Sequence, residues 1–512
     1  MDSFTVLNPS SILAWIAFIP LIGMGAVLCV PRTNMSVIKG ITYVATFIPL
    51  VLASVAYWGF DKDFQGYQYT MEAPWITLGT FEVYWRVGVD GLSLPLVWLT
   101  TILLFIAVPA SETVPRLSKA YYALLLMLQV GILGVFISLD YFLFYVFWEV
   151  MLLPMYFLIG IWGGPQREYA AIKFFLYTFA GSVLMLVALV AMYLDQGTFS
   201  IPAMMAVGKA GAWGGPVLLG MPFTTWVFWF LFVAFAIKIP CFPFHTWLPD
   251  AHVQAPTPIS VILAGILLKL GGYGLIRACF PIVPDAFQNF AFVLGVLGVI
   301  SIVYGAYVAL GQTDFKRMVA YSSVSHMGFV LLGMAALTEW GMNGAALQMF
   351  NHGTSSAACF LVVGVIYDRA HHRDLNAFGG IAQPMPCYWA LSTVAFFASL
   401  GLPGMAGFVS EAMTLVGSFQ SGDERFKILV LISCIGVVMT AAYILWAMQR
   451  VFLGPLNEKY KDYKDITGRE IFSLAPLLFL CVFLGIFPFY LLDWMDVGVS
   501  DLMVILQFKP GS

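Results

Sequence analysis

Four ionisable side chains interrupt long apolar runs of the sequence. Glu149 lies in FYVFWEVMLLPMYF, Lys238 in VAFAIKIPCFPFH, Lys269 in ILAGILLKLGGYG and Glu411 in GLPGMAGFVSEAMTL. Placing one such group in the hydrocarbon of a membrane costs roughly 2.5–3.5 kcal/mol, so it is usually kept for a function. A buried Glu–Lys pair that only holds helices together is the simpler alternative. Two acids and two bases together favour a series of groups that exchange protons.

Four histidines extend this set. His326, in SSVSHMGF, and His352, in MFNHGTS, lie inside apolar runs, whereas His245 and His252 flank a polar segment that follows Lys238. Imidazole gains and loses a proton near neutral pH. One such histidine alone is more often a satisfied core residue. Together with the Glu and Lys residues, the four histidines indicate a proton relay.

Lys238 and Glu411 each lie beside a predicted helix break. Pro240 and Pro243 follow Lys238 almost at once, and proline forces the residue before it out of helical geometry. Lys238 then faces the negative end of the first half-helix. The segment 401–404 (GLPG) breaks the run before Glu411 in the same way. Broken helices at corresponding positions of two halves are typical of transporters built from inverted repeats.

The composition indicates the surroundings of these residues. Of the 512 residues, 61% are hydrophobic and 10% are charged, whereas soluble domains carry about 25% charged residues. This excludes a soluble enzyme, a disordered scaffold and a nucleic-acid binder, and the net charge of −3 shows no site for a polyanion. The seven cysteines form no C-x-x-C pair, so we expect neither zinc nor iron–sulfur sites in this chain.

The apolar runs predict an all-α polytopic membrane protein with about 14 transmembrane helices, arranged as two inverted five-helix repeats that each contain a broken helix. Glu149 and His326, Lys238 and Glu411, and Lys173 and His352 recur at nearly constant spacing. The predicted parts are 1–119 with the first three spans, 120–280 with the first repeat and its break near 238–246, 286–453 with the second repeat and its break near 401–407, and 454–512 with a cytoplasmic loop, the last span and a short tail.

The distribution of Lys and Arg predicts the orientation. Loops on one side of the predicted membrane hold roughly twice as many of these residues as loops on the other side. Lys316 is counted among the residues of the richer side. Since positive charge accumulates in cytoplasmic loops, we expect both termini to face the periplasm.

Four stretches together resemble a known family. HTWLPDAHVQAPTPISVILAGILLKLGGYGLIR, FWEVMLLPMYFLIG, KRMVAYSSVSHMGF and LPGMAGFVSEAM are similar to the proton-translocating membrane subunits of respiratory complex I, the NADH–quinone oxidoreductase. Glu411, where L- and N-type subunits have lysine, favours the M type, as do the block around Lys269 and the short end of the chain. Gln254 departs from the pattern, because the family often has an acid there.

The resemblance implies roles for individual residues. Glu149 would pair electrostatically with Lys238, the switchable site of the first half. Lys269 would be the central site and Glu411 the terminal site toward the outside, with His326 and His352 bridging the gap through water. Flavin, iron–sulfur clusters and quinone would belong to partner subunits, so we expect no cofactor or metal in this chain. Its partners would be L- and N-type subunits on either side, in a bacterial inner membrane.

The interaction energy between a carboxylate such as Glu149 and a buried lysine such as Lys238 is large enough to drive such a relay. A buried lysine holds its proton weakly, and a carboxylate about 4 Å away restores about 4 kcal/mol at an effective dielectric constant of 20. Driving one charge against 100 mV needs about 2.3 kcal/mol. Two alternatives stay open: a subunit of a multisubunit Na⁺/H⁺ antiporter, which would use the same residues, and a haem or quinone carrier, which the scarcity of paired histidines disfavours.

Overall fold

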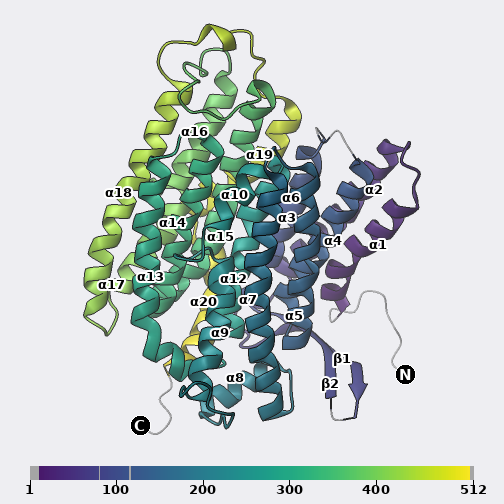
Figure 1. Cartoon of the computed structure of the whole chain (residues 1–512), viewed down its shortest axis with the longest axis vertical. Helices are drawn as coiled ribbons and strands as arrows, with labels where there is room; N and C mark the ends of the chain where they lie inside the picture. The colour runs from purple at the N-terminus through teal and green to yellow at the C-terminus, as the bar shows by residue number, and fades with distance from the viewer. Residues whose placement is uncertain (1–10, 80, 113, 115–116, 508–512) are drawn as a thin grey trace.

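The structure, a computed structural model of the whole chain, describes residues 11–79, 81–112, 114 and 117–507. Most of its helices run nearly parallel along the long axis of the molecule (Figure 1). The predicted all-α polytopic class is confirmed. One end carries the loop that follows α18, and the opposite end carries a small hairpin and the short helix α8 (Figure 1).

The helices and strands follow the chain in four groups. The N-terminal group contains α1 (Ile12–Cys29), α2 (Met35–Trp58), β1 (Gln68–Leu78), β2 (Phe81–Val89) and α3 (Ser93–Ala110). The second contains α4 (Ser118–Ile137), α5 (Tyr141–Val150), α6 (Leu152–Trp162), α7 (Arg167–Gln196), α8 (Ile201–Ala210), α9 (Phe223–Lys238), α10 (Trp247–Gln254), α11 (Thr257–Ile262), the π-helix η2 (Leu263–Leu267) and α12 (Leu268–Ala278). The third contains α13 (Pro284–Leu310), α14 (Phe315–Ala335), α15 (Glu339–Ala370), α16 (Pro386–Leu400), α17 (Ala406–Phe419) and α18 (Arg425–Phe452). The last contains η3 (Glu458–Tyr460), α19 (Gly468–Ile486) and α20 (Phe489–Leu506).

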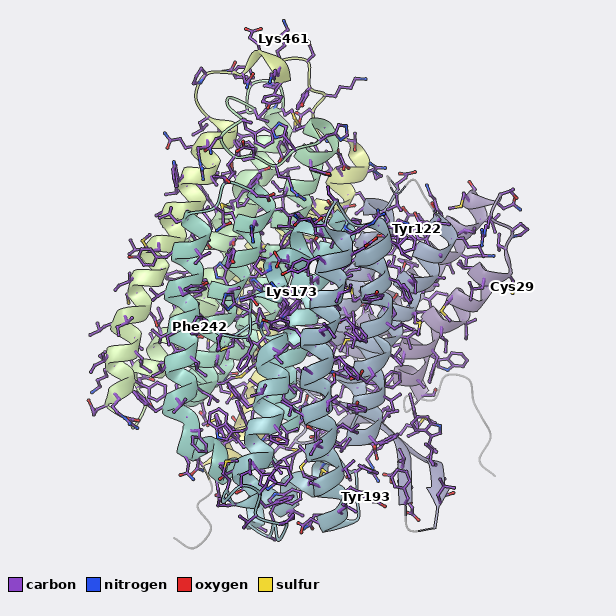
Figure 2. The ribbon with its side chains drawn as sticks, viewed as in Figure 1. Cys29, Tyr122, Lys173, Tyr193, Phe242 and Lys461 are labelled. Carbon is purple, nitrogen blue, oxygen red and sulfur yellow. The ribbon has the colours of Figure 1, made fainter. Side chains whose placement is uncertain are left out.

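Both predicted helix breaks are present. Among the described residues, 12 helical segments are long and apolar enough to cross a membrane, and α9 and α16 are apolar but shorter. Helix α9 ends at Lys238, before the two prolines, and α16 ends before Gly401, whose φ of 77° lies in the left-handed region. The predicted count of fourteen included these two interrupted segments. Phe242, in the first break, lies about midway between Lys461 at one end and Tyr193 near the other (Figure 2).

The helices that carry the candidate residues form the centre of the bundle. The most apolar stretches of 257–278 and α15 are 100% buried and that of α14 is 94% buried, against 33% for α1 and 28% for α2. Glycines allow this close packing: a methyl group at Gly298 on α13 would lie 2.9 Å from the carbonyl oxygen of Gly328 on α14. The two backbones therefore approach each other closely at this crossing.

Three elements were not predicted. Strands β1 and β2 form an antiparallel hairpin, and the amide of Leu139 donates to the carbonyl of Arg86 at 2.9 Å, which ties the hairpin to the start of α5. Helix α8 lies between two predicted spans. The predicted short tail contains α20, whose Trp494 ring stacks on Tyr57 of α2 with centroids 3.7 Å apart.

Candidate proton-relay site

Four titratable side chains from four helices meet in the centre of the bundle. They are Lys269 of α12, His352 of α15, His326 of α14 and Glu411 of α17, all buried. Nζ of Lys269 lies 2.7 Å from Nδ1 of His352, the rings of His352 and His326 are 5.5 Å apart, and Nδ1 of His326 lies 2.9 Å from Oε1 of Glu411. The structure therefore brings together four predicted site residues that are far apart in the sequence.

A local widening of the helix presents Lys269 to His352. The π-helix η2 precedes α12, and its geometry leaves carbonyl groups without their usual helical donors. Nζ of Lys269 donates to the carbonyl oxygen of Ala264 at 2.5 Å. The ammonium group is thus held between a backbone carbonyl and an imidazole. The sequence analysis did not predict this widening, which the regular hydrophobic pattern of 257–278 does not reveal.

The second helix break surrounds the carboxylate of Glu411. A methyl group at Gly401 would lie 3.1 Å from Oε2 of Glu411, so a side chain there would press on the carboxylate. Nε2 of Gln348 donates to Oε1 at 3.4 Å, and Nδ2 of Asn351 holds the start of α17 by donating to the carbonyl of Ala406 at 2.7 Å. Polar residues of α15 therefore position both the break and the acid that follows it.

Glu149 and Lys238 interact at a distance. Lys238 is 1% exposed at the C-terminus of α9, with its Nζ 5.3 Å from the centroid of the Trp148 ring and 5.5 Å from that of Phe174. The charge of Glu149 acts on Lys238, and Oε1 of Glu149 is buried without a hydrogen-bond partner among the described residues. No ion pair joins the two among the described residues, so the expected separation of about 4 Å is not reached. The structure also describes no hydrogen bond from Lys238 to the Lys269 group.

His245 and His252 are buried but stand apart from that group. His245 packs against the ring of Tyr304, with centroids 5.1 Å apart, and His252 stacks on Phe360 at 4.4 Å. In the described part of the chain, neither ring nitrogen of either histidine has a hydrogen-bond partner. Buried polar atoms normally have one, so a purely structural role explains these two histidines poorly.

Gln254, where the family often has an acid, has a structural role here. Its side-chain oxygen accepts a hydrogen bond from the amide of Gln166 at 3.0 Å. Its carbonyl accepts one from the amide of Gly164 at 2.9 Å. The residue thus fastens the end of α10 to the loop before α7.

Two cations that were counted as loop residues are buried. Lys316 lies in the first turn of α14, is 4% exposed and donates from Nζ to the carbonyl of Ala255 at 2.5 Å. Arg277, at the end of α12, pairs with Asp90 and donates to the hydroxyl of Tyr67 at 2.7 Å. Lys316 lies beside polar residues in the sequence and Arg277 near the end of an apolar run, so the burial of both depends on tertiary packing that local patterns do not reveal.

Among the described residues, no group of three or more His, Cys, Asp or Glu side chains is arranged to hold a metal ion.

Comparison with known proteins gives one consistent result. A family model described as NADH:quinone oxidoreductase/Mrp antiporter, transmembrane, matches residues 138–440. The chain is 40% identical over 508 residues to NADH-quinone oxidoreductase subunit M of Rhodobacter capsulatus, with 96% of each chain covered. It is similar to a chain of respiratory complex I from Thermus thermophilus with bound NADH, with a TM-score of 0.85, 27% identity and 97% and 99% of the two chains covered. A chain of the Mrp complex from Dietzia sp. shares the fold, with a TM-score of 0.84 at 19% identity, over 99% of this chain and 100% of that one.

Proposed function

The chain belongs to the family of transmembrane subunits shared by NADH:quinone oxidoreductases and Mrp antiporters, and we propose that it carries protons across the membrane for an NADH–quinone oxidoreductase. It is an antiporter-like membrane subunit of the M type, as the identity to subunit M over nearly its whole length shows. The resemblance noted in the sequence is thereby confirmed. Its partners are other subunits of that complex. L- and N-type subunits on either side are part of the proposal.

One observation carries the transport proposal: Lys269, His352, His326 and Glu411, whose side chains are of types that can exchange protons, form one buried series. Protons pass between groups at hydrogen-bond distance. The gap between the two histidine rings is short enough for one water molecule or a ring rotation to bridge. The ammonium group of Lys269 gives a proton to His352, His352 passes one to His326, and His326 passes one to Glu411. The neutral carboxyl group of Glu411 then releases its proton toward the periplasm.

Glu149 and Lys238 would supply the switch. Their interaction acts through space and not through contact, so a change in the position or charge of Glu149 alters how firmly Lys238 holds its proton. Glu149 is partly exposed as a residue, although Oε1 of its carboxylate is buried. The quinone chemistry takes place in partner subunits, and no cofactor is proposed for this chain.

The alternative is a subunit of a cation/proton antiporter. The likeness to the Mrp complex supports the fold only, since identity is 19%, whereas the relatives named subunit M are 40% identical over nearly the whole chain. Purification from the native membrane with identification of the associated chains separates the two. Co-purification with NADH-oxidising subunits supports the proposal, and co-purification with antiporter subunits alone refutes it.

A direct test uses inverted membrane vesicles. NADH oxidation and NADH-driven acidification of the lumen are measured for the wild type and for Lys269→Met, with the amount of assembled complex checked on native gels. We expect acidification per NADH to fall sharply in the variant. Unchanged acidification in fully assembled Lys269→Met complex would contradict the relay.

A further inference from the structure

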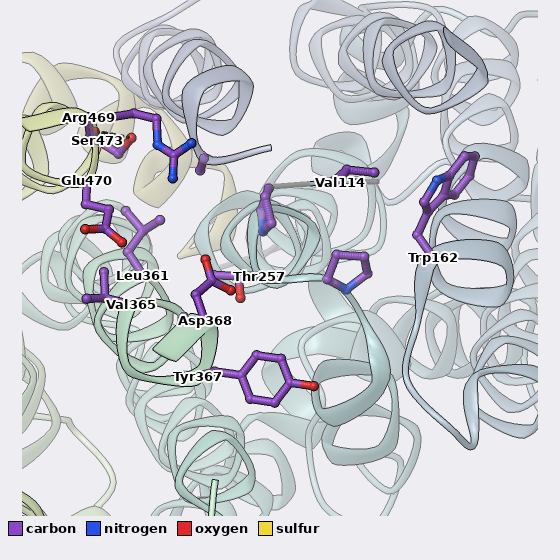
Figure 3. Close-up of a pocket in the computed structure, with 14 residues that line it drawn as sticks. Val114, Trp162, Thr257, Leu361, Val365, Tyr367, Asp368, Arg469, Glu470 and Ser473 are labelled. Carbon is purple, nitrogen blue, oxygen red and sulfur yellow. Dashed lines mark hydrogen bonds between the residues drawn. The ribbon is translucent and has the colours of Figure 1, made fainter. Parts of the chain in front are cut away.

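A cavity opens at the end of the bundle that carries the loop after α18, the side predicted to be cytoplasmic. Its volume is about 210 Å³, and it lies between α3, α6, α11, α15 and α19. Figure 3 shows Asp368 and Tyr367 of α15, Thr257 of α11 and Glu470 and Arg469 of α19 around it. Asp368 lines the cavity and is exposed. Its carboxylate is therefore accessible from this side of the membrane.

The buried side chain of Lys316 lies next to the chain segment that lines this cavity. Pro256 and Thr257 line the cavity, and the preceding residue, Ala255, accepts the hydrogen bond from Nζ of Lys316. The charge of Asp368 acts on Lys316, as do those of Asp314 and Arg373. Lys316 therefore lies directly behind the inner wall of the cavity and is coupled to the acid that lines it.

His252 lies on α10, three residues before Ala255, the residue whose carbonyl accepts the hydrogen bond from Lys316. The charges of both Lys316 and Lys269 act on the His252 ring, and His252 in turn acts on His352. Both ring nitrogens of His252 lack a hydrogen-bond partner among the described residues. An imidazole that is fully buried, flanked by two lysines and not used for packing hydrogen bonds can accept a proton on one side and donate it on the other.

A role in holding the end of α10 does not explain why a lysine is buried at position 316. Arg373 already fastens that end, by donating to the carbonyl of Val253 at 2.6 Å and to the carboxylate of Asp314 at 3.1 Å. A second buried cation at the same turn adds a desolvation cost. Lysine differs from arginine in that it can release its proton in a buried site.

We propose that Lys316 is a proton-transfer residue that takes protons from the Asp368 cavity and delivers them through His252 to Lys269. The ammonium group of Lys316 gives a proton to a neutral ring nitrogen of His252, and the resulting amine is recharged from the carboxyl group of Asp368. His252 passes its proton to Lys269 after that residue has lost its own to His352. The inference rests on the proposed function, because it supplies the inlet of the same relay.

The test compares a substitution that keeps the positive charge of Lys316 but not its proton exchange with one that removes both. Lys316→Arg retains the positive charge and can donate to the Ala255 carbonyl, but it does not release a proton. We expect acidification per NADH to fall by about tenfold or more in both Lys316→Arg and Lys316→Met, with assembled complex still present on native gels. Lys461→Met is the matched control: this lysine lies on the same side in the loop after α18, with 57% of its side chain exposed, and we expect wild-type pumping.

A second pair of variants keeps the inference testable where Lys316 variants fail to assemble. Asp368 is accessible, so Asp368→Asn is expected to fold and to slow proton uptake, and Asp368→Glu is expected to restore most of it. Wild-type pumping in Lys316→Arg, or in Asp368→Asn, overturns the inlet. If the inlet alone is wrong, acidification per NADH still falls sharply in Lys269→Met. If the proposed function is wrong, Lys269→Met pumps normally as well.

Discussion

Nδ1 of His326 lies 2.9 Å from Oε1 of Glu411, although 85 residues separate the two in the chain. The histidine comes from the middle of α14 and the acid from the helix that follows the second break. The Nε2 atom of the same ring lies 3.5 Å from the hydroxyl of Ser399 at the end of α16. The imidazole therefore joins the central relay to the break, and the carboxylate is the last titratable group of that series.

Glu411 is predicted to be the terminal proton acceptor. Glu411→Ala should strongly reduce NADH-driven proton pumping in inverted vesicles while the complex still assembles, because His326 loses the group that takes its proton. Glu411→Asp should be milder, since it keeps a carboxylate. Equal losses in the two variants, at equal complex abundance, would indicate a packing role.

The sequence identifies the four central residues but not their surroundings. Lys269, His326, His352 and Glu411 could be recognised because an ionisable group in an apolar run is costly wherever it lies. Their mutual distances could not, because they depend on the π-helix η2 and on the packing of four separate helices. Lys316 was missed for a physical reason: it follows the polar residues of the preceding turn, and only the packing of α14 against Ala255 buries it.

The orientation of the chain is a separate prediction. Roughly twice as many Lys and Arg residues on one side favour a cytoplasmic location for that side and a periplasmic one for both termini. In the structure, the start of α1 and the end of α20 both point to the half of the molecule that carries the hairpin (Figure 1). A reporter fused after Ser512 should be active only if it functions in the periplasm. Activity of a reporter restricted to the cytoplasm would contradict this topology.

The buried pair of Arg277 and Asp90 is predicted to be structural. Arg277→Met leaves the Asp90 carboxylate buried without its cation, which costs about 3–5 kcal/mol, so the abundance of assembled complex on native gels should fall. Adding Asp90→Asn should recover part of it by removing the unpaired charge. Arg425→Met is the control, because 63% of that side chain is exposed and its loss should change little. Normal assembly of Arg277→Met would show that the pair contributes little to stability.

Glu149 is predicted to set the proton affinity of Lys238 through space. Glu149→Gln keeps the shape of the side chain but removes the charge that acts on Lys238. Lys238, desolvated among Trp148 and Phe174, then loses the interaction that lets it reload. Pumping coupled to quinone reduction should fall by about tenfold or more, with the complex intact. The measurement is NADH oxidation together with membrane-potential formation in inverted vesicles.

A shifted carboxylate distinguishes an electrostatic role of Glu149 from a structural one. Tyr145 lies one helical turn before Glu149, is partly buried and is close enough for the two to interact. Tyr145→Glu added to Glu149→Gln should therefore recover part of the pumping, since residues four apart share a helix face. Leu153→Glu in the same background should recover less, because Leu153 is 48% exposed on the outside of the bundle. A through-space interaction tolerates a modest displacement of charge, whereas a specific contact does not. Near-normal pumping in Glu149→Gln alone would rule out the switch and leave Glu149 a structural residue.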